Sequence, residues 1–356
     1  MNKVCAVNPC IADLVPYNPK YLPAQAMMSA NENPADVPEE VRHDITRAMK
    51  SLLLNRYPDP LANELRQAIA DANGLDRECV LMGNGGDELL FDIALAWGGH
   101  NRTFLNLPPT FSVYENNARI TGTNIVNIAR KEDFSIDEEA VLARVAEGDI
   151  DYIIIASPNN PTGLLADEAF LLKLLSSTDA LVMVDEAYFE FSRTTMRPYL
   201  AQHKNLVLLR TFSKAFSLAG VRMGYILANH EIITQFIKVR QPYSVDAVSQ
   251  TIALEVYKHR ERFEPGIKRI IEQRGVMLRE LAGIEGVQVF PSDSNYILFR
   301  VKGVDASDVW RQLYAQGILI RDFSDGPLTE NCLRVSVESP EDNARFLEAL
   351  RQIMEG

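Results

Sequence analysis

One lysine, Lys214, lies between two short apolar runs of strand type within residues 205–228. Ser213 precedes it and Arg222 follows it. A lysine at the end of a buried strand can be desolvated, which lowers its pKa and makes its amine a candidate Schiff-base nucleophile. A serine hydroxyl and the planar fork of an arginine are donors that suit a phosphate. The plainer alternative is a surface lysine after a strand, and residues elsewhere in the chain decide between the two.

A glycine-rich segment offers a second candidate phosphate site. Residues 83–87 read Gly-Asn-Gly-Gly-Asp and are predicted to form the turn between a strand at 80–82 and a helix. Glycine lets the backbone approach closely, and a helix N-terminus presents N–H groups to an anion, so Gly86 and Asp87 are candidate contacts. An ordinary strand-to-helix turn explains the same residues equally well when they are taken alone.

Four further residues follow predicted strands and suit an aromatic ring that carries a hydroxyl and a basic nitrogen. Phe111 can stack on a ring, and Asn160 and Tyr188 can both reach a phenolic oxygen. Asp185 ends the apolar run 181–184, where a buried carboxylate is costly unless it meets a cation such as a protonated pyridine nitrogen. The alternatives are a core position for Phe111 and a helix N-cap for Asp185.

Alternating strand and helix patterns position these residues. About seven apolar runs, mostly separated by helical patterns, predict a doubly wound sheet that is largely parallel. In such sheets ligands bind at the carboxyl ends of the strands, so the candidate residues are expected to meet at one edge. The strands are expected at residues 80–82, 103–107, 124–128, 152–156, 181–184, 206–209 and 225–228.

The last third of the chain has a different pattern, in which helices and short strands follow no regular alternation. A helical pattern there breaks at Pro265-Gly266, because proline removes a backbone donor and glycine favours turns. We predict a large domain over residues 38–245 and a smaller α+β domain formed by residues 1–37 and 246–356.

Composition and charge exclude several classes of protein. The 356 residues are 47% hydrophobic and 24% charged, which is typical of a globular enzyme with more than one core. A net charge of −12 without a basic run argues against nucleic acid and a membrane surface as partners. We expect a cytoplasmic protein, since no apolar run is long enough to span a membrane and the N-terminus lacks a signal core. The four cysteines have no metal-site spacing, so no metal is expected.

Together these residues and their motifs resemble the fold-type-I pyridoxal-phosphate aminotransferases. The residues stand in order within SPNNPTG, DEAYFEF and TFSKAFSLAGVRMGY. Further segments narrow the resemblance to the histidinol-phosphate aminotransferase family, over essentially the whole chain: SANENP, NRYPDP, GNGGDEL, PPTFSVY and CLRVSVESPEDNARFLEAL. Five motifs in the right order are very specific for the cofactor and less specific for the substrate.

The resemblance implies a role toward the ring of pyridoxal 5′-phosphate for five residues. Lys214 would hold the cofactor as a Schiff base and move a proton, and Asp185 would keep the pyridine nitrogen protonated. Asn160 and Tyr188 would bind the ring hydroxyl. Phe111 would stack on the ring, at a position where the family more often has tyrosine.

The resemblance likewise implies five contacts to the cofactor phosphate. Gly86 and Asp87 would donate mainly through backbone N–H groups, and Ser213 and Arg222 through their side chains. Tyr57 would reach the phosphate bound by the neighbouring subunit. The family resemblance therefore implies a homodimer whose active sites are shared.

Substrate binding is assigned by resemblance to Arg334, Arg321 and Tyr17, with Asn33 and Tyr243 as further candidates. The arginines would bind the substrate anions, although either could instead form a surface ion pair. Glu338 departs from the glycine that the family usually has after the strand of Arg334, and we expect its side chain to point away from the anion site.

The implied reaction transfers an amino group from L-histidinol phosphate to 2-oxoglutarate, a step of histidine biosynthesis. An aromatic amino-acid aminotransferase and a threonine-phosphate decarboxylase are alternatives on the same fold. A cofactor-binding transcriptional regulator is a third alternative. It would need a basic DNA-binding module ahead of this domain, and the residues before Asn55 are not basic.

Overall fold

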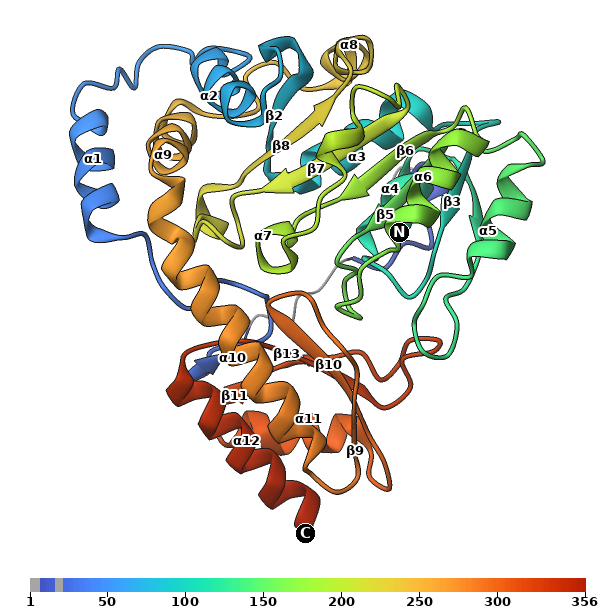
Figure 1. The fold of residues 1–356 in the computed structure, drawn as a ribbon, viewed down its shortest axis with the longest axis vertical. Coiled ribbons are helices and arrows are strands. Elements are labelled where there is room, and N and C mark those ends of the chain that lie inside the picture. Colours follow the sequence, from blue (N-terminus) through green and yellow to red (C-terminus); the bar gives the residue numbers. More distant parts are fainter. Residues whose placement is uncertain (1–6, 17–21) are drawn as a thin grey trace, which may run out of the picture.

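Two separate sheets organise the computed structural model, which describes residues 7–16 and 22–356 (Figure 1). The larger, seven-stranded sheet has the strand order β2-β8-β7-β6-β5-β3-β4. All neighbouring strands in it are parallel except β8, which is antiparallel to both β2 and β7. The prediction of a seven-stranded, mostly parallel sheet is therefore confirmed. Its strands are β2 (Val80–Asn84), β3 (Thr103–Asn106), β4 (Asn124–Asn127), β5 (Tyr152–Ala156), β6 (Leu181–Asp185), β7 (Leu206–Thr211) and β8 (Met223–Ala228).

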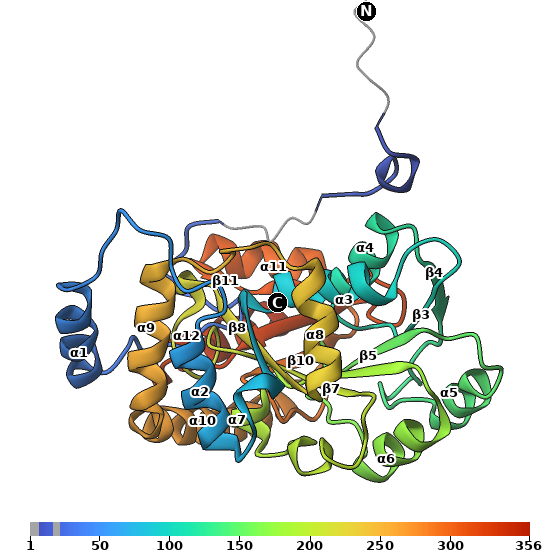
Figure 2. The same ribbon diagram turned by 90° about the horizontal axis from the view of Figure 1, so that it is seen from above.

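Helices cover both faces of this sheet (Figure 2). Successive side chains of a strand point to opposite faces, so Val182 and Val184 pack in one core cluster and Leu181 and Met183 in the other. One face is covered by α3 (Gly85–Trp97), α4 (Val113–Ile120) and α8 (His230–Val239). The other is covered by α2 (Asn63–Asn73), α5 (Glu138–Val145), α6 (Glu168–Ser177) and α9 (Ala247–Lys258). Helix α1 (Glu39–Met49) contacts α9, and α7 (Phe189–Ser192) is a single turn after β6.

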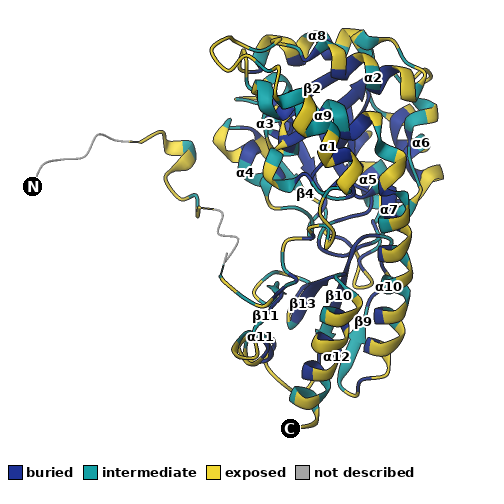
Figure 3. Cartoon of the chain, turned by 90° about the vertical axis from the view of Figure 1, so that its left-hand side faces the viewer, coloured by how far each residue is buried: buried dark blue, intermediate teal, exposed yellow. Residues whose placement is uncertain are grey.

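The smaller sheet is antiparallel, with the strand order β12-β13-β10-β9. A separate parallel pair joins β1 (Ala26–Met27) to β11 (Ile318–Leu319), so the N-terminal segment meets the C-terminal part of the chain. Strands β10 and β13 are largely buried and β9 and β12 are partly exposed, while the helices around them expose their outer faces (Figure 3). The elements are β9 (Val287–Val289), β10 (Tyr296–Val301), β12 (Arg321–Asp322), β13 (Cys332–Ser336), α10 (Glu264–Ala282), α11 (Ala306–Ala315) and α12 (Pro340–Glu355). The domain boundaries themselves stay a prediction.

Two predicted segments are corrected by the structure. Residues 83–87 are not a turn, because β2 continues to Asn84 and α3 begins at Gly85, whose φ of +76° turns the strand directly into the helix. Pro265-Gly266 does not break α10 but lies in its first turn, where a missing N–H has no helical partner to lose. Helix α8 was not among the predicted elements. Among the described residues, no helix is both long enough and apolar enough to cross a membrane.

Candidate active site

A cavity of about 650 Å³ lies where the two sheets meet. Its walls come from the ends of the large-sheet strands, from residues 29–32, and from the small-sheet strands β12 and β13. The structure thus brings most of the predicted site residues into one cavity. They are Gly86, Asp87, Phe111, Asn160, Asp185, Tyr188, Ser213, Lys214, Arg222, Arg321 and Arg334.

Strand direction explains this gathering. Strands β2, β3, β5, β6 and β7 end at the same edge of the sheet, and the antiparallel β8 begins there. Arg222 therefore enters the site from the residue before β8, while Lys214 enters from the loop after β7. The chain order reverses between β3 and β5, which is where open α/β sheets bind ligands.

Lys214 lies in the cavity wall with its Nζ donating to the carbonyl oxygen of Ala30 at 2.8 Å. Burial, together with the positive charge of Arg334, lowers the pKa of Lys214 to about 8. A substantial fraction of the amine is therefore neutral near physiological pH. A neutral amine is the nucleophilic form, so the site activates this lysine.

Asp185 is the last residue of β6 and is almost completely buried. The Tyr114 hydroxyl donates to its Oδ2 at 2.6 Å, and the backbone N–H of Ala187 donates to its Oδ1 at 3.0 Å. Burial raises the pKa of Asp185 to about 6, against the lowering effect of these two hydrogen bonds. The carboxylate is still mostly charged at neutral pH, and each oxygen retains acceptor capacity for a cation in the cavity.

Tyr114 is a residue that the sequence analysis missed. It lies on α4, is buried, and meets the Phe111 ring edge-on with centroids 5.6 Å apart. It therefore supports both the carboxylate and the candidate stacking ring. Its position one helical turn after Phe111 was an available signal, but its contact with Asp185 depends on the tertiary fold.

Arg334 and Asn160 join the two sheets across the cavity. The guanidinium of Arg334 donates to Asn160 Oδ1 at 2.5 Å and to the carbonyl oxygen of Ser29 at 2.6 Å. It also lies over the rings of Tyr296 and Phe323, at 5.0 and 5.2 Å from their centroids. Because Arg334 binds the side-chain oxygen of Asn160, the N–H groups of the same amide remain available to donate to a ligand.

Tyr188 contacts a second residue that was missed. Its hydroxyl accepts a hydrogen bond from Asn31 Nδ2 at 3.0 Å, and its ring lies edge-on to Tyr296. Asn31 is buried and lines the cavity together with Glu32, whereas the predicted Asn33 donates to the Ala215 carbonyl and is not part of the lining that the structure describes.

An anion cradle forms at the N-terminus of α3. Asn84 occupies the N-cap position, yet its side chain makes no capping hydrogen bond, so the first-turn N–H groups keep their capacity to bind an anion. Gly224 passes so close that a Cβ there would lie 2.8 Å from the backbone of Gly85 and Gly86. Only glycine fits this approach, which keeps the cradle open.

Arg222 closes one side of the cradle. Its Nη2 lies 2.7 Å from Asp87 Oδ2, and its Nη1 donates to Ser213 Oγ at 3.5 Å. The backbone of Arg222 has a φ of +57°, an unfavourable conformation for a side chain of this size. A Cβ on Gly85 would lie 2.7 Å from Nη2, so that glycine makes room for the guanidinium.

Two further predicted site residues, Tyr57 and Tyr243, lie outside this cavity lining. Tyr57 is 82% exposed and stacks on Tyr243, with ring centroids 4.6 Å apart, and neither belongs to the described lining of the cavity. Tyr17 lies outside the residues that the structure describes. Glu338 is half-buried and also outside that lining; burial, Asp342 and Glu32 raise its pKa to about 8.

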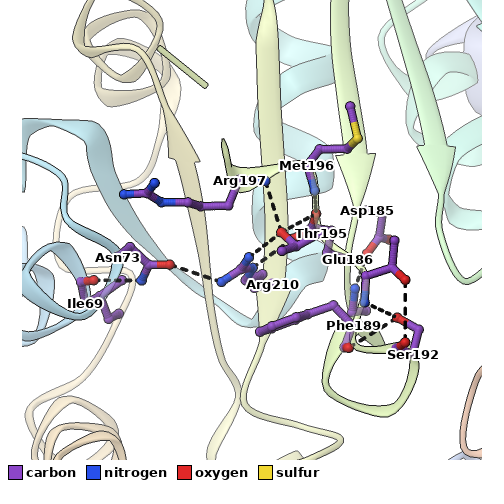
Figure 4. Close-up of polar contacts among 12 residues, drawn as sticks. Ile69, Asn73, Asp185, Glu186, Phe189, Ser192, Thr195, Met196, Arg197 and Arg210 are labelled. Carbon is purple, nitrogen blue, oxygen red and sulfur yellow. Dashed lines mark hydrogen bonds and ion pairs between the residues drawn. The ribbon is translucent and has the colours of Figure 1, made fainter. Parts of the chain in front are cut away.

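A buried polar network lies next to the site (Figure 4). Glu186, the residue after Asp185, accepts from Arg210 Nε at 2.9 Å and from the backbone N–H of Met196 at 2.7 Å. The Thr195 hydroxyl contacts both carboxylate oxygens of Glu186, and Arg210 also donates to that hydroxyl at 2.7 Å. The Arg210 guanidinium lies 3.8 Å above the Phe189 ring. Each charge in this network is matched by protein groups.

The cavity combines an anion cradle, a buried carboxylate, hydroxyl and amide donors, an activated lysine and two further arginines. These groups fit a flat aromatic ring with a phosphate at one end and a basic nitrogen at the other, which are the features of pyridoxal 5′-phosphate. The cradle carries the strongest evidence, because its helix N-terminus is uncapped and two glycines hold it open.

Comparison with known proteins identifies relatives over nearly the whole chain. Residues 24–350 match the family described as Aminotransferase class I and II. The histidinol-phosphate aminotransferase of Caldanaerobacter subterraneus subsp. tengcongensis is 37% identical over 95% of this chain and 95% of its own length. Histidinol-phosphate aminotransferase 1 of Carboxydothermus hydrogenoformans is 36% identical over 99% of this chain and its full length, 100%.

Solved structures share the fold. The histidinol-phosphate aminotransferase from Sinorhizobium meliloti, in complex with pyridoxal-5′-phosphate, superposes with a TM-score of 0.89 at 24% identity, covering 99% of each chain. The L-threonine-O-3-phosphate decarboxylase from Porphyromonas gingivalis superposes with a TM-score of 0.82 at 26% identity, covering 93% of this chain and 100% of its own.

Proposed function

The chain belongs to the class I and II aminotransferases and, within them, to the histidinol-phosphate aminotransferase family, and on that premise we propose its reaction. It transfers the amino group of L-histidinol phosphate to 2-oxoglutarate, forming imidazole acetol phosphate and L-glutamate. The observation that supports this reaction most strongly is one cavity in which an activated lysine and a buried carboxylate face two arginines of the small sheet.

Five residues are proposed to hold the ring of pyridoxal 5′-phosphate. Asp185 binds the protonated ring nitrogen with its carboxylate, and Phe111 stacks on the ring. The amide of Asn160 and the hydroxyl of Tyr188 bind the ring oxygen, and Lys214 forms the covalent link. When bound, the cofactor supplies an electron sink that makes the substrate Cα–H bond acidic.

Gly86 and Asp87 would hold the cofactor phosphate in the α3 cradle with their first-turn N–H groups, and Ser213 and Arg222 would hold it with their side chains. Fixing the phosphate at the helix N-terminus sets the distance from Asp185 and Lys214 to the ring.

Lys214 is the proposed proton carrier. Its pKa of about 8 leaves Nζ able to accept a proton from the substrate Cα and to release it again near neutral pH. Arg334, which is held by Asn160 and Ser29, orients one substrate anion. Arg321 lies opposite Arg334 in the register of β12 and β13 and adds a second guanidinium, which suits an anion that alternates between the phosphate of histidinol phosphate and a carboxylate of glutamate.

We further propose a homodimer with shared active sites, located in the cytoplasm. Tyr57 and Tyr243 form an exposed aromatic pair outside the cavity of their own chain, and Tyr57 would contact the phosphate bound by the partner subunit. Residues 38–245 would form the large domain, and residues 1–37 with 246–356 the small one. Tyr17, Asn33 and Tyr243 stay predicted substrate contacts.

A substrate comparison tests the proposal. Purified protein with pyridoxal 5′-phosphate is assayed for transamination of histidinol phosphate, phenylalanine and tyrosine with 2-oxoglutarate, and for carbon dioxide release from O-phosphothreonine. We expect histidinol phosphate to give the highest kcat/KM. A decarboxylase is the second candidate because of the structural likeness to the Porphyromonas gingivalis enzyme, and carbon dioxide release without transamination would replace the proposal by that function.

A further inference from the structure

The exposed stack of Tyr57 on Tyr243, here called the tyrosine pair, joins two loops that are far apart in the sequence. Tyr57 lies between α1 and α2, whereas Tyr243 lies between α8 and α9. The backbone of Tyr243 has a φ of +59°, which is unfavourable for a residue with a Cβ and persists only where surrounding contacts impose it. Side chains beneath the pair provide such contacts.

Arg240, the residue after α8, ties the two loops together. It is only 9% exposed, and its Nη1 donates to the carbonyl oxygen of Pro60 at 2.6 Å. Its Nη2 donates to Ser244 Oγ at 3.1 Å. One buried guanidinium thus bonds to the loop of Tyr57 with one nitrogen and to the loop of Tyr243 with the other.

Gln250 on α9 repeats this arrangement. Its Nε2 donates to the carbonyl oxygens of Asp59 at 2.9 Å and of Val245 at 3.0 Å. The two loops are therefore held together at two points by side chains from adjoining segments. We call Arg240 and Gln250 together the loop clamp.

Asn84 ties the clamped loops to the anion cradle. Its Nδ2 donates to the Ser244 carbonyl at 3.0 Å, and the side chain makes no capping hydrogen bond to α3. Its backbone N–H is bound by Glu88 Oε2 at 2.7 Å, so the residue is fixed at both ends. The tyrosine pair accordingly has a defined position relative to the cradle of its own chain.

We propose that Arg240 is a positioning residue for the active site of the partner subunit, an inference that rests on the shared-site dimer proposed above. An exposed tyrosine on a free loop would lose conformational entropy on binding, with a cost for each backbone residue that becomes ordered. The loop clamp orders the loop in advance, so Tyr57 reaches the partner's cofactor phosphate without that cost.

The test must separate positioning from stability, because Arg240 is buried and Asp92 on α3 is close enough for each charge to affect the other. Heterodimers make this separation. One chain carries Lys214→Ala, so only the other chain binds pyridoxal 5′-phosphate covalently, and that single site receives Tyr57 from the Lys214→Ala chain. Arg240→Met is then placed either in the Tyr57-donating chain or in the chain that retains Lys214.

The measured quantity is the dissociation constant of pyridoxal 5′-phosphate at the Lys214 site, followed by the absorbance of the lysine-bound cofactor. We expect about tenfold weaker binding when Arg240→Met is in the Tyr57-donating chain, and less than a twofold change when it is in the other chain. Gln250→Leu should show the same asymmetry with a smaller amplitude. An equal loss in both arrangements, or no loss in either, overturns the proposal.

Two controls identify the cause of a failure. Arg66→Met removes another buried arginine that binds backbone carbonyls, those of Val80 and Arg77, and it should affect both arrangements equally. Tyr57→Phe should be asymmetric in the same sense as Arg240→Met. If Tyr57→Phe weakens cofactor binding in only one arrangement but Arg240→Met does not, the role of the loop clamp is refuted and the shared site is kept. If both variants weaken binding equally in the two arrangements, the shared site is refuted as well. Wild-type protein without lysine-bound cofactor would refute the proposed function.

Discussion

Asp185 and Glu186 are neighbours in the chain, and both are buried, with 6% and 1% of their surfaces exposed. The Glu186 carboxylate is fully engaged by Arg210, Thr195 and the backbone of Met196 (Figure 4). The Asp185 carboxylate has only two neutral donors, from Tyr114 and Ala187, and no described cation of the protein as an ion-pair partner. Two successive acids thus meet opposite environments.

The difference separates groups that stabilise the fold from groups that serve a ligand. Glu186 is matched by the protein itself, as buried charges in a stable core must be. Asp185 has a pKa raised to about 6 by burial, so holding it ionised at neutral pH opposes folding. Lys214 shows the same property with the opposite charge, since burial lowers its pKa to about 8. Substitutions in the two regions should therefore change stability in opposite directions.

Replacing Lys214 should have the largest effect. Lys214→Ala removes both the covalent link to the cofactor and the proton carrier, so we expect kcat to fall by about 10³- to 10⁴-fold while the cofactor-free protein stays folded. In the wild-type protein, borohydride reduction should fix the cofactor on the peptide that contains Lys214. Labelling of a different lysine would show that Lys214 does not bind the cofactor.

Arg210→Met should give the largest loss of stability. It leaves Glu186 as a buried carboxylate without its cation, which typically costs about 3–5 kcal/mol in the free energy of unfolding. Urea unfolding of the cofactor-free protein measures the change. The double variant Arg210→Met/Glu186→Leu removes the orphaned charge and should recover most of the loss. A single variant within about 1 kcal/mol of wild type would show that the network contributes little.

Asp185→Asn should separate stability from activity. The amide cannot stabilise a protonated pyridine, so we expect kcat to fall by about 10²- to 10³-fold. The folded-state pKa of Asp185 lies above its unfolded value, so stability falls as pH rises through the interval up to about 6. Removing the charge should therefore stabilise the cofactor-free protein by about 1 kcal/mol at pH 7. Near-normal turnover would make Asp185 a structural cap instead.

Tyr114→Phe should have the smallest effect and one that depends on pH. The Tyr114 hydroxyl lowers the pKa of Asp185, so its loss raises that pKa above about 6. A protonated Asp185 no longer attracts a pyridinium, so cofactor affinity falls on the acid side of this pKa. We expect the inflection of affinity against pH to move upward by less than about one unit, with no change at pH 8. An unmoved inflection would show that Tyr114 only packs against Phe111.

Much of the large sheet could be predicted because its strands, apart from the partly exposed edge strand β4, are buried and mostly apolar runs bounded by glycine, proline or polar residues. The direction of β8 could not be predicted, since an apolar run has the same composition in either direction. Helix α8 was predictable from Asn229 as its N-cap and from Ile232, Ile233 and Phe236 at helical spacing. This helix was not predicted although its signal is present in the sequence.

The site could be predicted in part for a related reason. Lys214, Asp185 and Asn160 follow strands, and strand ends converge whatever the details of packing. The hydrogen bonds of Tyr114 and Asn31 depend on how helix α4 and the N-terminal segment pack, which no local pattern encodes. The role of Tyr57 is harder still to predict, because its proposed ligand is bound by another subunit and a single chain cannot show that contact.

The floor of the cavity joins the beginning of the chain to its end. The backbone N–H of Asn31 donates to the Ser336 hydroxyl across 305 residues, and β1 pairs with β11. On the ribosome, residues 26–32 emerge first but obtain these partners only when synthesis is almost complete. A nascent chain thus exposes Lys214 before Arg321 and Arg334 can complete the cavity wall, so the pocket closes only when almost the whole chain has been made.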